Sequence, residues 1–117
     1  MNYDDCFSTR TAMLVGDEAM ARLQNTSVII FGLGGVGSWC AESLVRSGVG
    51  HLTLVDPDCV DVTNINRQLP ALHSTVGHPK VEVLRERLLD INPNAEIIAR
   101  QERFSADNAF NFQLSTM

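Results

Sequence analysis

The chain has 117 residues, of which 44% are hydrophobic and 20% charged, and its formal net charge is −5. This composition is typical of a single folded domain and excludes a disordered or fibrous chain, while the negative charge excludes a general attraction to nucleic acid. No apolar run approaches the roughly 18 residues of a membrane span, and the N-terminus, which carries Asp4 and Asp5, lacks a signal-peptide pattern. We therefore predict a cytoplasmic protein without a membrane segment.

The N-terminal part is predicted to be an arm followed by a short helix. Residues 1–9 are polar and irregular in pattern, whereas Asp17–Gln24 has helical spacing with Met20 and Leu23 on one side. Asp17 is a suitable N-cap. Residues 1–26 are therefore interpreted as an N-terminal arm and helix that precede the core.

Residues 27–100 alternate between apolar strand patterns and helical patterns. The first helix is expected to turn Val36, Cys40 and Leu44 into the core, and the strands are apolar enough to be covered on both faces. This order predicts an α/β fold, a Rossmann-like parallel sheet that forms the βαβαβ half of a doubly wound nucleotide-binding domain. The predicted strands are Ser27–Phe31, Leu52–Asp56 and Glu96–Ala99, and the predicted helices run from Val36 to about Arg46 and from Lys80 to about Asp90.

Four glycines follow the first strand directly and open the first helix of this core. Glycines allow a tight turn and a close approach to an anion, towards which the free N–H groups of the helix then point. Asp56 comes 19 residues after the last of these glycines, where a Rossmann unit hydrogen-bonds a ribose hydroxyl. The pattern predicts a nucleotide site that includes Gly32, Gly34, Gly35 and Gly37.

The connection between Pro57 and Pro79 is long and follows the carboxyl end of a strand, where open α/β sheets bind ligands. It contains Asn64, Arg67 and Gln68, and Lys80 follows it. Two cations beside a phosphate site favour a triphosphate over a dinucleotide, because attack at an α-phosphate needs positive charge where negative charge develops. The alternative is that both cations are solvated surface charges, with Lys80 only beginning a helix.

These motifs together resemble the N-terminal half of the ubiquitin-activating-enzyme-like adenylyltransferase superfamily. The resemblance rests on residues 10–16, 32–37, 55–58, 64–68 and 77–80 and ends near Asn92 and Pro93. Within that superfamily, residues 35–39, 63–68 and 103–108 are most similar to the branch of the tRNA threonylcarbamoyladenosine dehydratases. Members are about twice as long, so the 117-residue domain is expected to be truncated, with residues 101–117 beginning a further crossover.

The resemblance implies ATP and Mg²⁺ as cofactors and a homodimer in which Arg10 reaches into the partner's site. Arg10, Arg67 and Lys80 would be catalytic, and no metal ligand is assigned within this chain. The implied nucleotide-binding residues are Gly32, Gly34, Gly35, Gly37, Asp56, Asp58, Asn64, Arg67, Gln68 and Lys80.

The implied activity is ATP-dependent adenylation of a carboxylate, that of the threonylcarbamoyl group on tRNA, followed by its cyclisation. One alternative is adenylation of a ubiquitin-like sulfur-carrier protein, and a second is an NAD-dependent oxidoreductase that uses Asp56 on the adenosine ribose. A binding module without catalysis is a third. In members of the superfamily, the second half of the chain carries a metal-associated aspartate. This chain alone is therefore expected to be inactive.

Overall fold

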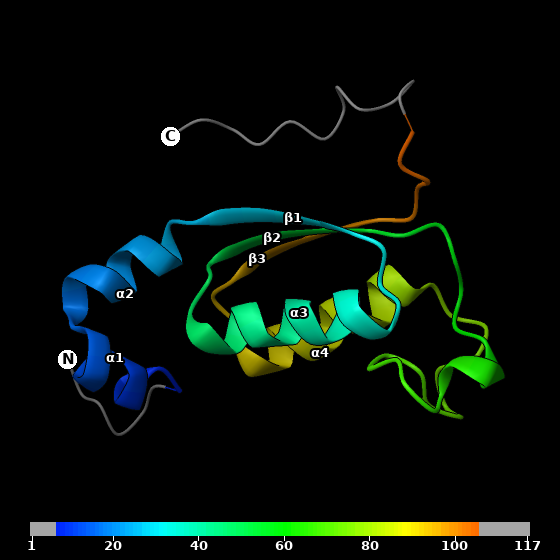
Figure 1. Ribbon diagram of the computed structural model, residues 1–117, viewed down its shortest axis with the longest axis horizontal. Coiled ribbons are helices and arrows are strands. Elements are labelled where there is room, and N and C mark those ends of the chain that lie inside the picture. The colour runs from blue at the N-terminus through cyan, green and yellow to red at the C-terminus, as the bar shows by residue number, and fades with distance from the viewer. Residues whose placement is uncertain (1–6, 106–117) are drawn as a thin grey trace.

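A computed structural model describes residues 7–105 of the chain (Figure 1). Two short helices precede a unit in which strands and helices alternate, and a 3₁₀ turn lies in the connection after the second strand. The elements are α1 (Thr9–Val15), α2 (Asp17–Gln24), β1 (Ser27–Phe31), α3 (Gly35–Ser47), β2 (His51–Val55), η2 (Val62–Asn64), α4 (Lys80–Ile91) and β3 (Glu96–Arg100).

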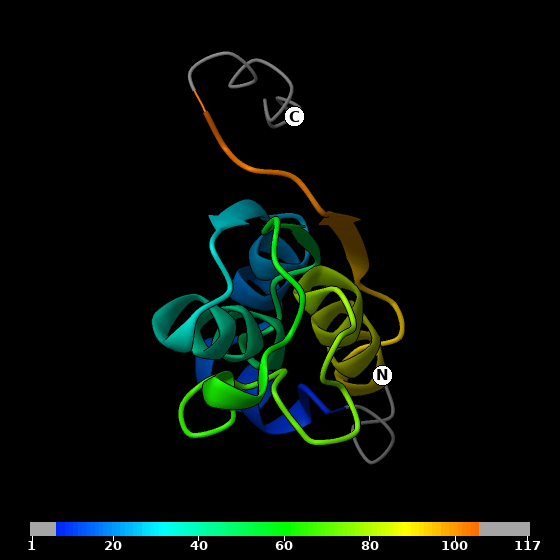
Figure 2. The same ribbon diagram turned by 90° about the vertical axis from the view of Figure 1, so that its right-hand side faces the viewer.

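The three strands form a parallel sheet in the order β1-β2-β3. Ser27 of β1 is level with His51 of β2, which in turn is level with Glu96 of β3. Both crossover helices, α3 and α4, lie side by side on the same face of the sheet (Figures 1 and 2). This arrangement confirms the predicted α/β fold with a Rossmann-like parallel sheet.

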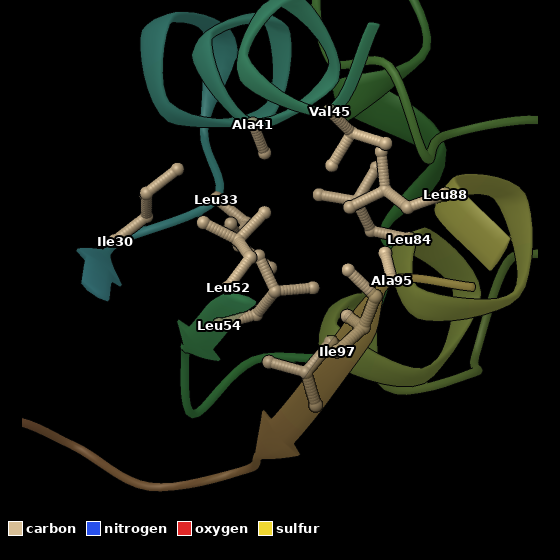
Figure 3. Packing of buried hydrophobic residues seen from close by; sticks show 11 residues of the cluster. Ile30, Leu33, Ala41, Val45, Leu52, Leu54, Leu84, Leu88, Ala95 and Ile97 are labelled. Atoms are coloured by element: carbon tan, nitrogen blue, oxygen red, sulfur yellow. The ribbon is translucent and has the colours of Figure 1, made fainter. Parts of the chain in front are cut away.

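The hydrophobic core fills the space between the sheet and the two helices (Figure 3). Leu52 and Leu54 of β2 lie at its centre and are almost completely buried, as are Leu84 and Leu88 of α4. Burying a leucine side chain contributes about 1.5–3 kcal/mol, so this layer supplies much of the stability of the unit. The cluster comprises Ile30, Leu33, Ala41, Val45, Leu52, Leu54, Val81, Leu84, Leu88, Ala95 and Ile97.

The inward face of α3 differs from the sequence prediction. Val36 is 87% exposed and Cys40 is also exposed, so the prediction that both pack into the core is wrong. Gly37 instead faces the end of β1, since a Cβ there would stand only 1.9 Å from the carbonyl oxygen of Gly32. Residues four and eight positions later, Ala41 and Val45, therefore point inward.

An acidic side chain joins the two crossover helices. The carboxylate of Glu42 on α3 pairs with Arg87 of α4 and, at 3.3 Å, with Arg46 one turn along its own helix. Hydrogen bonding to Arg87 lowers the pKa of Glu42 below its ordinary value and outweighs the opposing effect of burial, with a smaller contribution from Arg46. This network fixes α3 against α4.

The N-terminal segment also departs in part from the prediction. Helix α2 has the expected bounds, but Gly16 occupies the N-cap and Asp17 is the first helical residue. Helix α1 was not predicted, because it has no side-chain cap and leaves Met13 and Leu14 exposed, so it shows no apolar stripe. Within residues 7–105, no helix is long and apolar enough to cross a membrane.

The second face of the sheet carries no helix among residues 7–105 (Figure 1). Phe31 and Ile98 on this face are 45% and 47% exposed, although the sequence predicted strands covered on both faces. The ring of Phe104 contacts that of Phe31, with centroids 4.4 Å apart. Residues 101–105 form neither helix nor strand, and the remainder of the predicted further crossover lies outside the described residues.

Candidate functional site

The glycine-rich turn joins the carboxyl end of β1 to the N-terminus of α3. Gly32 has a φ of 91°, which a residue with a side chain rarely adopts, and its N–H donates to the carbonyl of Val55 at 2.8 Å. Gly34 is the N-cap of α3 and offers no side-chain cap. The first N–H groups of a helix have no partner inside it, so the start of α3 can receive an anion.

Asp56 lies beside this turn at the end of β2 and is 5% exposed. Its Oδ2 accepts the N–H of Leu33 at 2.7 Å, and its Oδ1 accepts the N–H of Asp58 at 2.8 Å. The carboxylate thus connects the glycine-rich turn to the loop that follows β2. Sequence reasoning assigned Asp56 to a ribose and missed this structural connection; a lone pair on each oxygen still allows a ribose contact.

The loop after β2 contains the turn η2, which Asp61 caps. The side chain of Asp61 accepts the N–H of Thr63 at 2.9 Å, while Oδ1 of Asn64 accepts the N–H of Asp61 at 2.9 Å. Hydrogen bonds from the hydroxyl and the N–H of Thr63 lower the pKa of Asp61, and the positive charge of Lys80 adds a smaller effect. Asn64 is buried and its carbonyl oxygen already accepts one hydrogen bond, so its amide N–H groups are its donors for an anionic ligand.

Arg67 and Gln68 lie over the glycine-rich turn. A Cβ on Gly35 would stand 3.7 Å from the Cγ and the carbonyl oxygen of Arg67, and one on Gly34 would stand 3.8 Å from Nε2 of Gln68. Gln68 is 8% exposed, and its Oε1 has no hydrogen-bond partner among the described residues. A buried polar atom without a partner costs about 1–3 kcal/mol, so this amide is available to a ligand.

Lys80 begins α4 and is 6% exposed, which excludes the interpretation that it is a solvated surface charge. Its backbone N–H donates to the carbonyl of Asp58 at 3.1 Å. Within residues 7–105, no carboxylate lies within ion-pair distance of its ammonium group. Arg67, by contrast, is exposed, and its guanidinium donates to the carbonyl of Thr63 and to Oδ1 of Asn66.

The fold therefore gathers most of the predicted residues at the carboxyl ends of the strands. Arg10 is the exception, because it is exposed on α1, at the opposite end of the sheet (Figure 1). Asp58 lies beside Asp56 with an exposed side chain. The described part of the chain holds no group of three His, Cys, Asp or Glu side chains that could bind a metal ion.

A parallel strand, a glycine-rich turn and an uncapped helix N-terminus define a Rossmann-like domain of the nucleotide-binding type. The sequence matches the ThiF family model over residues 8–115, and the chain belongs to the ThiF family. This confirms the resemblance to the adenylyltransferase superfamily.

The chain is similar to the tRNA threonylcarbamoyladenosine dehydratase of Bacillus subtilis, with 54% identity over 91 residues that cover 78% of this chain and 36% of that protein. The structure of the Escherichia coli tRNA N6-threonylcarbamoyladenosine dehydratase in complex with ATP is also similar, with a TM-score of 0.85 and 42% identity. That match covers 88% of this chain and 42% of the other. A sulfur carrier protein adenylyltransferase of Thermus thermophilus is 38% identical over 95 residues, which cover 81% of this chain and 35% of that protein. The chain spans less than half the length of these relatives.

Proposed function

We propose that this chain forms the ATP-binding part of an enzyme that adenylates the threonylcarbamoyl carboxylate of modified tRNA. The observation that supports it most is the juxtaposition of the Arg67 side chain, the amide nitrogen of Gln68 and the uncapped start of α3, because all three offer hydrogen-bond donors to phosphate oxygens. The 54% identity to the tRNA threonylcarbamoyladenosine dehydratase of Bacillus subtilis favours this substrate.

In this proposal the phosphates of ATP bind at the N-terminus of α3, where Gly34 and Gly35 allow a close approach. Arg67, Lys80 and the amide group of Asn64 would bind the triphosphate, and Asp56 and Asp58 would face the ribose. The positive charges of Arg67 and Lys80 stabilise negative charge that develops during attack at the α-phosphorus. Placing these groups before the reaction lowers the barrier without a covalent bond to the enzyme.

The reaction joins a carboxylate oxygen of the substrate to the α-phosphorus and breaks the bond to the β-phosphate, so that pyrophosphate leaves. The activated acyl group then cyclises and releases AMP. Mg²⁺, when bound, would neutralise phosphate charge. Because Mg²⁺ commonly uses one or two carboxylates together with phosphates, the absence of a three-residue cluster among residues 7–105 is compatible with it.

We also propose a cytoplasmic homodimer in which Arg10 completes the site of the other subunit. The support is that Arg10 is exposed on α1, at the end of the sheet away from the glycine-rich turn of its own chain (Figure 1). A cytoplasmic location accords with ATP and tRNA as substrates.

Nucleotide binding is tested by titrating ATP and NAD into the purified chain at fixed salt and Mg²⁺. We expect tighter binding of ATP, and a loss of about tenfold or more in Lys80→Ala, because a hydrogen bond to a charged group contributes about 1.5–3 kcal/mol. Glu86→Ala serves as a control, since Glu86 is an exposed residue of the same helix. Tighter binding of NAD, or an unchanged affinity of Lys80→Ala for ATP, would refute the assignment.

The acceptor is tested by measuring pyrophosphate release with threonylcarbamoyl-modified tRNA, with unmodified tRNA and with a sulfur-carrier protein. The Bacillus subtilis dehydratase provides the positive control. Release only with modified tRNA supports the proposal, whereas release only with the carrier favours the second function, for which the relative from Thermus thermophilus is the specific support. ATP binding without pyrophosphate release in the presence of any acceptor is the result expected if this chain alone is inactive, and it would identify the chain as the nucleotide-binding part only.

A further inference from the structure

Two adjacent side chains near the start of α3 connect the helix to the loop that carries Arg67. The hydroxyl of Ser38 donates to the carbonyl of Gly34 at 2.7 Å and accepts the N–H of Leu69 at 3.2 Å. The indole N–H of Trp39 donates to the carbonyl of Arg67 at 3.2 Å. The helix thus contacts the loop backbone on both sides of Gln68.

These contacts differ in burial. Ser38 is fully buried, so its two hydrogen bonds are shielded from water, and the loss of its hydroxyl would leave the N–H of Leu69 without that partner. Trp39 is 53% exposed and is absent from the hydrophobic core cluster. Its ring therefore contributes little to core packing, whereas its N–H fixes the carbonyl of the residue whose side chain lies over Gly35.

We propose that Ser38 and Trp39 are positioning residues that hold Arg67 and Gln68 at the distance from the glycine-rich turn that nucleotide phosphates require. The proposal rests on the proposed binding of ATP at this turn. Without the two anchors, the segment from Arg67 to Leu69 could move away from Gly34 and Gly35, and binding would then carry the entropic cost of ordering it. Fixing it beforehand removes that cost.

The proposal also makes Trp39 a reporter of this site. It is the single tryptophan of the chain, and its indole hydrogen bond ends on the backbone of Arg67. Phosphates that draw the Arg67 side chain towards α3 would change the surroundings of the ring. We therefore expect the fluorescence emission of the wild-type chain to change on titration with ATP and to saturate at the affinity that calorimetry gives.

The main variant is Trp39→Phe, which keeps an aromatic ring and removes the N–H donor. We expect its affinity for ATP to fall about fivefold, the scale of one hydrogen bond, while its thermal midpoint stays within about 3 °C of the wild type. Affinity for AMP should change less than twofold, because AMP lacks the outer phosphates. Ser47→Ala is the matched control, since the Ser47 hydroxyl bonds only to a carbonyl one turn back on α3, and it should bind ATP as the wild type does.

Equal ATP affinity of Trp39→Phe and the wild type, with no response of Trp39 emission to saturating ATP, would overturn the positioning role and leave the proposed function intact. An equal loss for ATP and AMP, accompanied by a lower thermal midpoint, would also overturn it, because it would show a general structural defect. A wild-type chain that binds no ATP would overturn both proposals.

Discussion

Replacing Gly37 by alanine tests whether the close approach between α3 and β1 shapes the glycine-rich turn. The added methyl group would stand 1.9 Å from the carbonyl oxygen of Gly32 and 3.0 Å from its carbon. Ordinary contact begins near 3.4 Å, so the helix and the turn must separate by about 1.5 Å. Both atoms belong to the backbone of a glycine at φ 91°, and no side chain can rotate to make room.

Overpacking of this kind lowers the free energy of unfolding by about 3 kcal/mol at the upper end of its usual range. The higher helix propensity of alanine offsets about 1 kcal/mol of that loss. We therefore expect Gly37→Ala to lose about 2 kcal/mol in the free energy of unfolding. Urea denaturation followed by circular dichroism measures this change. Affinity for ATP should fall as well, because the turn that receives the phosphates is displaced.

Gly35→Ala is the matched control, since its methyl group would meet nothing closer than 3.7 Å. We expect its stability to stay within about 0.5 kcal/mol of the wild type while its ATP affinity falls, because the methyl group occupies space that the phosphates would use. If Gly37→Ala proved as stable as Gly35→Ala, the close approach would not constrain the turn and the reasoning would be refuted.

Three further predictions concern stability. Because the pKa of Glu42 is lower in the folded chain, the contribution of its carboxylate to the free energy of unfolding is complete above the ordinary value of 4.5 and is lost as the pH falls through the folded pKa. The free energy of unfolding should therefore differ less between pH 6 and pH 3 in Glu42→Gln than in the wild type. An equal difference would contradict this. Asp56→Ala should lose about 2 kcal/mol in urea denaturation, since the buried N–H of Leu33 and the part-buried N–H of Asp58 lose their acceptor; a loss below about 0.5 kcal/mol would show that those bonds are not needed. Gly48→Ala should lose about 1 kcal/mol, because φ is 114° and the methyl group would meet Met20 at 2.8 Å; an unchanged thermal midpoint would exclude this strain.

Much of this fold was predictable because parallel strands leave a strong apolar signal. β1 has the bounds that the sequence predicted, and α4 begins at Lys80 as expected. The inward face of α3 was not predictable from apolar spacing alone. Its rotation is set by the contact of Gly37 with Gly32 five residues earlier, a steric constraint that the sequence expresses only as a glycine.

The candidate site was predictable in its residue types and less so in its hydrogen bonds. Arg67 and Gln68 were assigned to the nucleotide site, and the structure puts them over the glycine-rich turn. The anchoring contacts of Ser38 and Trp39 were missed, although both residues stand in the motif that begins at Gly35. Serine and tryptophan in a helix carry no signal of a distant backbone partner, which only the fold supplies.

The strand order has a consequence for the order in which the strands can pair during folding. Pairing of β1 with β2 brings together Ser27 and His51, 24 residues apart, whereas pairing of β2 with β3 joins His51 to Glu96, 45 residues apart. Loop-closure entropy makes the first pairing easier by about 0.6 kcal/mol. We expect the βαβ unit that contains the glycine-rich turn to form early in folding, and Lys80 to reach its buried place only when α4 docks.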